Sequence, residues 1–127
     1  MSITYQADDY VPSGSCFKGH VVASYNTMVE VFGEPNMPFS DKIWNEWAVR
    51  FNVPDEDDLD SEEVYVTIYD WKESHSNQSR YGEYSWNVGS KSRKAVGLVL
   101  DALNEPETME RLDGQYISFG GFYPLSV

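Results

Sequence analysis

The sequence predicts an α+β fold: an antiparallel sheet of about four to five strands with helices packed on one face. Three segments that alternate apolar and polar residues follow one another with no helical segment between them, which favours antiparallel pairing. Segments with helical spacing lie before and after those three, so helices are expected to cover one face of the sheet. The 127 residues, 41% of them hydrophobic, suffice for a single domain (1–127) with one core.

The N-terminal part is expected to hold an arm, a strand and a short helix. Residues 1–15 are mainly polar and predict a loose arm. Residues 16–23 end in β-branched side chains and predict a strand. A helix is expected over 26–32, because an apolar stripe with helical spacing ends at Gly33 and Pro35 stops continuation.

The middle of the chain predicts the three successive strands. They are expected at 43–51, at 63–71 and around 84–88, with a polar loop over 72–82. Residues 54–62 would form an enlarged acidic loop between the first two. These two strands should therefore form a hairpin with a strongly charged tip.

The C-terminal part predicts helices and a final strand. The longest helix should begin at Ser90 or Ser92, since apolar residues at 96, 99, 100 and 103 share one face. Pro106 is suited to open a second short helix. Aromatic and β-branched residues predict a last strand over 115–123.

The composition argues against several classes of function. A formal net charge of −12 disfavours direct nucleic-acid binding, which needs clustered Lys and Arg. There is no apolar run of membrane-spanning length and no secretory signal, so we expect a cytoplasmic protein. Cys16, the single cysteine, permits no internal disulfide.

No catalytic residues, cofactor site or metal site are predicted. Cys16 and His20 supply too few ligands for a structural zinc site. The acidic loop lacks the spacing and the glycine of an EF-hand, because Leu59 occupies a ligand position. The serines show no nucleophile-elbow pattern. A non-catalytic binding protein is the simplest interpretation.

A candidate partner-binding surface combines the acidic loop with aromatic residues of the same hairpin. Acidic loops steer association with basic partners, and aromatic side chains supply affinity. A solvated loop tip and ordinary core aromatics are the alternatives. The candidate residues are Asp55, Glu56, Asp57, Asp58, Asp60, Trp44, Tyr65, Tyr69 and Trp71. Because helices cover only one face of the sheet, aromatics on the other face could also pack against a second copy, so a homodimer is a further expectation.

A second candidate site is the basic segment at the expected start of the long helix. Cations at a helix N-terminus oppose the helix dipole, and a bound anion would relieve this. Neighbouring carboxylates could equally neutralise them. The candidate residues for a nucleotide-like anion are Ser90, Lys91, Ser92, Arg93 and Lys94.

Several short motifs occur together in a recognisable order. They are Phe32-Gly33-Glu34-Pro35 at a helix end, Asp41-Lys42 before Glu46-Trp47, the strand Thr67-Ile68-Tyr69-Asp70-Trp71-Lys72, and Trp86-Asn87-Val88-Gly89. Together they resemble a family of small tailed-phage and prophage proteins, over roughly residues 19–103. Two departures are the acidic insertion at 55–63 and Ser90, where the family pattern has a second glycine.

The resemblance implies a phage accessory protein acting in the host cytoplasm, and it carries over no catalytic residues. The order of helix, glycine, proline and tryptophan strand is also similar to that of protein-binding modules of the β-lactamase-inhibitor-protein type. Two functions are therefore expected as alternatives: binding, with or without inhibition, of a host protein, or binding of a small anion.

Overall fold

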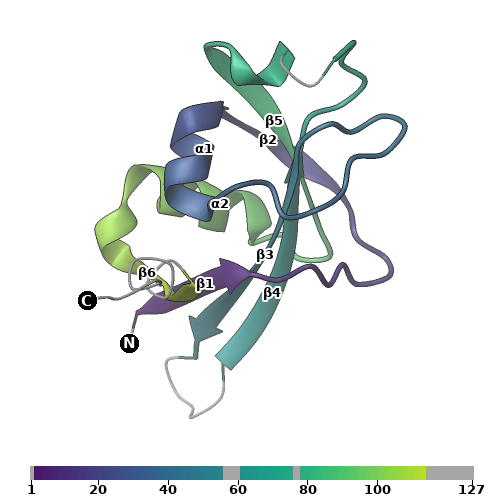
Figure 1. Cartoon of the computed structure of the whole chain (residues 1–127). Coiled ribbons are helices and arrows are strands. Elements are labelled where there is room, and N and C mark those ends of the chain that lie inside the picture. Colours follow the sequence, from purple (N-terminus) through teal and green to yellow (C-terminus); the bar gives the residue numbers. More distant parts are fainter. Residues whose placement is uncertain (1, 56–60, 76–77, 114–127) are drawn as a thin grey trace, which may run out of the picture.

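The computed structural model describes residues 2–55, 61–75 and 78–113. Six strands form one sheet in the order β2-β5-β4-β3-β1-β6, and two helices lie on one face of it (Figure 1). The elements are β1 (Ile3–Ala7), β2 (Cys16–Ser24), α1 (Tyr25–Phe32), β3 (Glu46–Pro54), β4 (Ser61–Tyr69), β5 (Glu83–Ser90), α2 (Ala95–Asn104) and β6 (Met109–Arg111), with 3-10 turns at Gln78–Arg80 and Pro106–Thr108. The predicted α+β class is confirmed, although the sheet has six strands.

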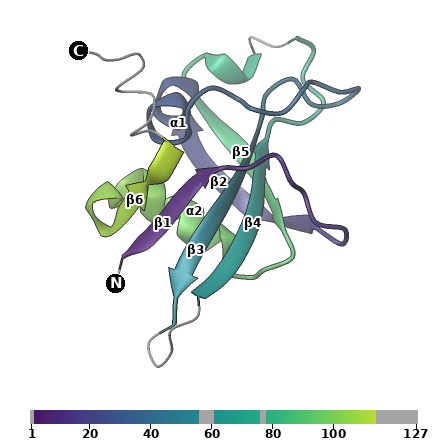
Figure 2. The same ribbon diagram turned by 60° about the horizontal axis from the view of Figure 1, so that its bottom comes forward.

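Strand pairing is antiparallel except at one edge. The β3–β4 hairpin is the longest ladder and runs from the pair Glu46–Tyr69 to the pair Pro54–Ser61. The edge strand β6 pairs in parallel with β1, which makes the sheet mixed. Figure 2 shows β1 lying between β3 and β6, so residues from the two ends of the described chain meet in the sheet.

The prediction of a loose arm over residues 1–15 is wrong for its first half, which forms β1. Tyr5 is only 7% exposed, and its hydroxyl donates a hydrogen bond to the carbonyl of Val31 at 2.9 Å. Ile3, Tyr5 and Ala7 alternate with two polar residues, but over only five positions. So short a segment gives a weak pattern, and its burial depends on neighbours distant in sequence.

The predicted helix over 26–32 is confirmed as α1, and both of its ends have local causes. The Ser24 hydroxyl accepts a hydrogen bond from the backbone N–H of Thr27 at 3.1 Å, which caps the first turn. Gly33 ends the helix with φ 86° and ψ −172°, a conformation that glycine alone adopts easily. The Trp47 indole donates to the Gly33 carbonyl at 2.7 Å and fixes this end against β3.

The long helix begins later than the sequence predicts. α2 starts at Ala95, because β5 continues through Ser90 and a turn occupies residues 91–94. The Ser90 hydroxyl donates to the carbonyl of Tyr65 at 2.7 Å, which ties this end of β5 to β4. The predicted strands at 43–51 and 63–71 are displaced to 46–54 and 61–69, and the expected strand at 115–123 lies outside the described residues.

The core lies between the sheet and the two helices. Trp47, Phe51, Ile68 and Trp86 are almost fully buried there, together with Met28 of α1. The alternate residues of β3, β4 and β5 face the opposite side of the sheet, which neither helix covers. Within the described parts of the chain, no helix is long and apolar enough to cross a membrane.

Candidate partner-binding site

The acidic loop begins and ends at the last pair of the β3–β4 hairpin, Pro54 and Ser61. Asp55 is exposed. The other predicted loop residues, Glu56, Asp57, Asp58 and Asp60, lie outside the described residues. The charged loop therefore leaves the sheet at Pro54 and returns at Ser61, and the side chains around these two residues form the base of the loop.

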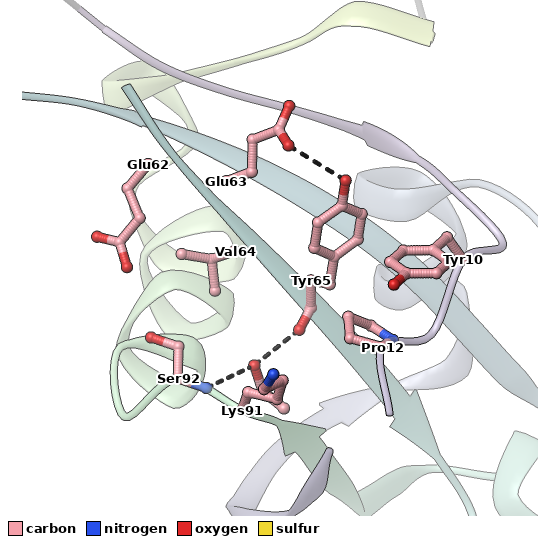
Figure 3. Close-up of a pocket in the computed structure, with 9 residues that line it drawn as sticks. Tyr10, Pro12, Glu62, Glu63, Val64, Tyr65, Lys91 and Ser92 are labelled. Carbon is pink, nitrogen blue, oxygen red and sulfur yellow. Dashed lines mark hydrogen bonds between the residues drawn. The ribbon is translucent and has the colours of Figure 1, made fainter. Parts of the chain in front are cut away.

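A hollow of about 470 Å³ lies beside the base of this loop. Figure 3 shows Tyr10 and Pro12, from the segment after β1, next to Tyr65 of β4. The lining residues are Tyr10, Pro12, Glu62, Glu63, Val64, Tyr65, Ser90, Lys91 and Ser92. The hollow thus combines two tyrosines with two carboxylates and one lysine.

The two tyrosines are held in an edge-to-face contact. Their ring centroids are 5.1 Å apart with an interplanar angle of 83°, and the Tyr65 hydroxyl donates to Glu63 at 3.2 Å. Tyr10 is positioned by Asp8, whose backbone N–H donates to the Ala48 carbonyl and whose carboxylate pairs with Arg50 at 3.2 Å. Tyr10 remains 58% exposed, so one of the aromatic walls is open to a partner.

Sequence reasoning missed Tyr10 because it assigned residues 1–15 to a loose arm. If β1 had been predicted as a strand paired with β3, the residues that follow β1 would have been expected beside the β3–β4 hairpin. Tyr65, which the sequence indicates as a candidate partner-binding residue, is half-buried.

Local cations neutralise part of the charge at this site. Lys94 forms an ion pair with Glu62, and Arg50 lies 4.0 Å from Glu63 as well as binding Asp8. The ion pair of Lys94 with Glu62 is exposed on both sides and contributes little to stability. The surplus of negative charge therefore comes from the loop residues beyond Asp55.

The remaining predicted aromatics lie at the other end of the hairpin. Tyr69 pairs with Glu46, eight positions from the Pro54–Ser61 pair, or roughly 26 Å at about 3.3 Å per residue. Trp71 follows Tyr69 and Trp44 precedes Glu46, so both lie farther still from the loop. Of the four predicted aromatics, Tyr65 alone therefore lines the hollow at the base of the acidic loop, and the other three lie toward the opposite end of the hairpin.

The surroundings of Trp71 are also electrostatically unlike the loop. The ammonium groups of Lys42 and Lys72 lie 5.7 Å and 5.8 Å from the centre of the Trp71 ring, within the range of cation–π contacts. Phe17, Tyr69 and Trp71 line a smaller hollow of about 220 Å³ on the uncovered face. The hairpin thus has an acidic end, where Tyr65 contacts Tyr10 of the segment after β1, and a second aromatic end flanked by lysines.

The Trp44 and Trp71 ends of the strands are joined through a buried carboxylate. Asp70 is 0% exposed and accepts hydrogen bonds from the N–H groups of Trp44 at 2.8 Å and Asn45 at 3.2 Å, and from the Ser79 hydroxyl at 2.8 Å. Arg80 donates to the side-chain oxygen of Asn45 at 2.8 Å. These hydrogen bonds anchor the predicted polar loop over 72–82 to the strands, which is a structural role.

Glu46 is a half-buried carboxylate on the uncovered face near this network. Burial raises the pKa of Glu46, and the negative charge of Asp70 raises it further. It sits across from Tyr69 in the β3–β4 pairing. The negative charge of Glu46 in turn raises the pKa of Tyr69, after the larger effect of burial.

The predicted anion site is only partly assembled. The Ser90 hydroxyl bonds the Tyr65 carbonyl and accepts from the N–H of Ser92, and the Ser92 hydroxyl accepts from the N–H of Lys94. Lys94 is paired with Glu62. Lys91 and Arg93 form no ion pair with any residue that the structure describes. The hydroxyls of both serines therefore stabilise the turn before α2. An anion bound beside Lys91 would be repelled by the carboxylates of Glu62 and Glu63, which line the same hollow.

The described residues contain no group of three or more His, Cys, Asp and Glu side chains placed to hold a metal ion. Comparison with models of known protein families, with curated proteins and with solved structures found no match to this chain. The similarity to a tailed-phage family therefore stays a prediction from the sequence motifs.

Proposed function

We propose that this chain is a non-catalytic binding protein that attaches to a basic surface of another protein through the acidic end of its β3–β4 hairpin. The observation that supports the proposal most strongly is the hollow at the loop base, where Tyr10 and Tyr65 stand beside Glu62 and Glu63. Aromatic faces and carboxylates together suit Arg and Lys side chains, which stack on rings and pair with carboxylates.

The acidic loop and the tyrosines would affect different rate constants of binding. Exposed carboxylates chiefly raise the association rate with a basic partner, while partly buried aromatics chiefly slow dissociation. The resemblance to phage proteins suggests the context: an accessory protein that binds, and in doing so blocks, a protein in the cytoplasm of a bacterial host.

An affinity capture from bacterial host lysate, followed by mass spectrometry, tests this proposal. The bait is compared with a loop variant in which Asp57, Asp58 and Asp60 are replaced by Asn. A matched control changes the same number of exposed acids on the helical side: Glu30→Gln, Asp101→Asn and Glu107→Gln. We expect a basic protein that the wild-type and control baits retain and the loop variant loses. Equal recovery with all three baits would contradict the proposal.

The alternative, an anion-binding protein, is supported only by Lys91 and Arg93, which lack ion pairs in the described chain. A ligand that binds only the folded state raises the free energy of unfolding by RT ln(1 + [L]/Kd), so the melting temperature rises with ligand concentration. If phosphate or ATP stabilised the wild type but not a Lys91→Ala/Arg93→Ala variant at equal ionic strength, this alternative would replace the protein-binding proposal.

A further inference from the structure

The two edges of the sheet differ in length and protection. The edge strand β6 is only three residues long. The opposite edge is β2, which is nine residues long and pairs with β5 alone among the described strands. A long exposed edge offers unpaired N–H and C=O groups to another strand, and proteins usually protect such edges.

The second half of β2 has few of the usual protective features. The pairing with β5 is irregular between Phe17 and Gly19 but regular from Gly19 to Ser24. This stretch contains no proline and no Lys or Arg. The Ala23 carbonyl accepts a hydrogen bond from the Trp86 indole at 2.9 Å. The part of the β2 edge that we consider available for pairing is therefore Gly19–Val22.

The side chains beside this edge are apolar and exposed. Val22 is 61% exposed and Phe17 is 53% exposed, and the Phe17 and His20 rings are 4.9 Å apart. Phe17 also lines the hollow with Tyr69 and Trp71, so the apolar surface continues from β2 onto the uncovered sheet face. Exposed apolar surface of this kind is typical of an interaction site.

The distribution of charge favours a second copy of this chain over a basic partner at the β2 edge. The chain carries 21 acidic residues, yet β2 has none, and its only full cation is Lys18. Cys16 lies at the level of Val66 in the neighbouring ladders, and β2 runs from there away from the acidic loop. A second copy could therefore approach along β2 without bringing the two acidic loops together, whereas a strongly basic partner would be drawn to the loop instead.

We propose that β2 is the interface with a second copy of this chain, with the Gly19–Val22 segments of the two copies running antiparallel beside each other across a two-fold axis. Such pairing extends one six-stranded sheet into the other and covers the β2 edge of each copy. Val22 and Phe17 of each copy become buried. The Pro54–Ser61 pairs, at which the two acidic loops leave the sheets, lie toward opposite ends of the dimer, so that β2 pairing does not bring them together.

Sedimentation equilibrium at 150 mM salt, over a hundredfold range of concentration, tests this interface. We expect the wild type to reach 29 kDa, twice the 14.5 kDa of one chain, and Val22→Lys to remain at 14.5 kDa. The matched control is Leu112→Lys, which changes an exposed apolar residue at the opposite edge and should still form the dimer. A wild type that is monomeric throughout, or a Val22→Lys variant that dimerises like the wild type, would overturn the proposal.

Hydrogen exchange of the unmodified protein provides a second measurement should Val22→Lys fail to fold. The backbone amides of Gly19–Val22 that point outward should exchange more slowly as the protein concentration rises, while those of α2 should not change. Protection of β2 that is independent of concentration in a sample that does dimerise would place the interface elsewhere and contradict the proposal.

Discussion

Asp70 shows how one residue joins segments that are far apart in the sequence. Its carboxylate is fully buried and accepts hydrogen bonds from Trp44, Asn45 and Ser79. We expect Asp70→Asn to lower the free energy of unfolding by about 1–3 kcal/mol. The amide NH2 group would replace a carboxylate oxygen that now accepts hydrogen bonds, so buried donors would face another donor and lose their acceptor. Urea denaturation measures the change, and exposed Asp41→Asn should stay within about 0.5 kcal/mol of wild type. An Asp70→Asn variant as stable as the control would contradict this role.

Glu46 should make stability depend on pH in a direction that can be worked out. Burial raises the pKa of Glu46 in the folded state above its unfolded value, so folding favours its protonated form. Unfolding therefore becomes easier as pH rises from the unfolded pKa through the folded one. We expect Glu46→Gln to be more stable than wild type above that interval and to lose the advantage below it. Melting temperatures measured between pH 3.5 and 7 test this; an advantage that grows toward acid pH would have the wrong sign.

The residue scale is where the sequence was least informative. Asp70 belongs to a recognisable strand motif, but nothing near it in the sequence identifies the donors that it accepts from, which lie 9 to 26 residues away. Tyr10 was missed for the same reason, since its neighbour Tyr65 is 55 positions later. Contacts of this range depend on tertiary structure rather than on local pattern.

Two glycines in different elements should respond to alanine in opposite directions. Gly33 has φ 86° and ψ −172°, and an added Cβ would lie 2.6 Å from the Arg111 guanidinium. We expect Gly33→Ala to cost about 1–3 kcal/mol of unfolding free energy. Gly97 is a residue of α2 with open space around its Cα, so Gly97→Ala should stabilise by about 0.5–1 kcal/mol. Chemical denaturation of both variants measures the difference, and equal effects would show that backbone conformation is not what distinguishes them.

Elements with long, regular patterns were predictable from the sequence. α1 was found because an apolar stripe with helical spacing ends at Gly33 and is followed by Pro35, and β4 because aliphatic residues alternate with Tyr and Thr from Val64 to Tyr69. β1 is five residues and β6 three, too short for either to stand out. The start of α2 was placed too early because Ser90 and Ser92 look like helix caps, although Ser90 bonds β4 instead.

The acidic loop should be separable from the fold. Pro54 and Ser61 are already paired, so a two-residue Asn-Gly turn can replace residues 55–60. We expect the melting temperature of this variant to change by no more than a few degrees, about the shift that 1 kcal/mol produces in a domain of this size. Circular dichroism on heating provides the measurement. A variant that fails to fold would show that the loop is required for structure.

The distribution of charge is a property of the whole molecule that the sequence disclosed only in part. The acidic segment was evident as a run of residues, and most of the net charge of −12 comes from it. The sequence did not reveal that Lys42 and Lys72 flank Trp71 at the far end of the same hairpin. These lysines lie on separate connecting segments, and only the pairing of β3 with β4 brings them to one ring. Tyr10 and Tyr65, rather than Trp44 and Trp71, are therefore the aromatics that we expect to contact the partner.

Surface plasmon resonance with the captured partner, at 50 and 300 mM salt, tests the central claim most directly. It compares the wild type, the Asp57/Asp58/Asp60→Asn variant and Tyr65→Ala. We expect the loop variant to associate more slowly at low salt with a flatter salt dependence, because fewer charges steer the encounter. Tyr65→Ala should keep the association rate and dissociate at least fivefold faster, the effect of losing about 1 kcal/mol of contact. An unchanged association rate in the loop variant, together with an unchanged dissociation rate in Tyr65→Ala, would contradict binding through this end of the hairpin.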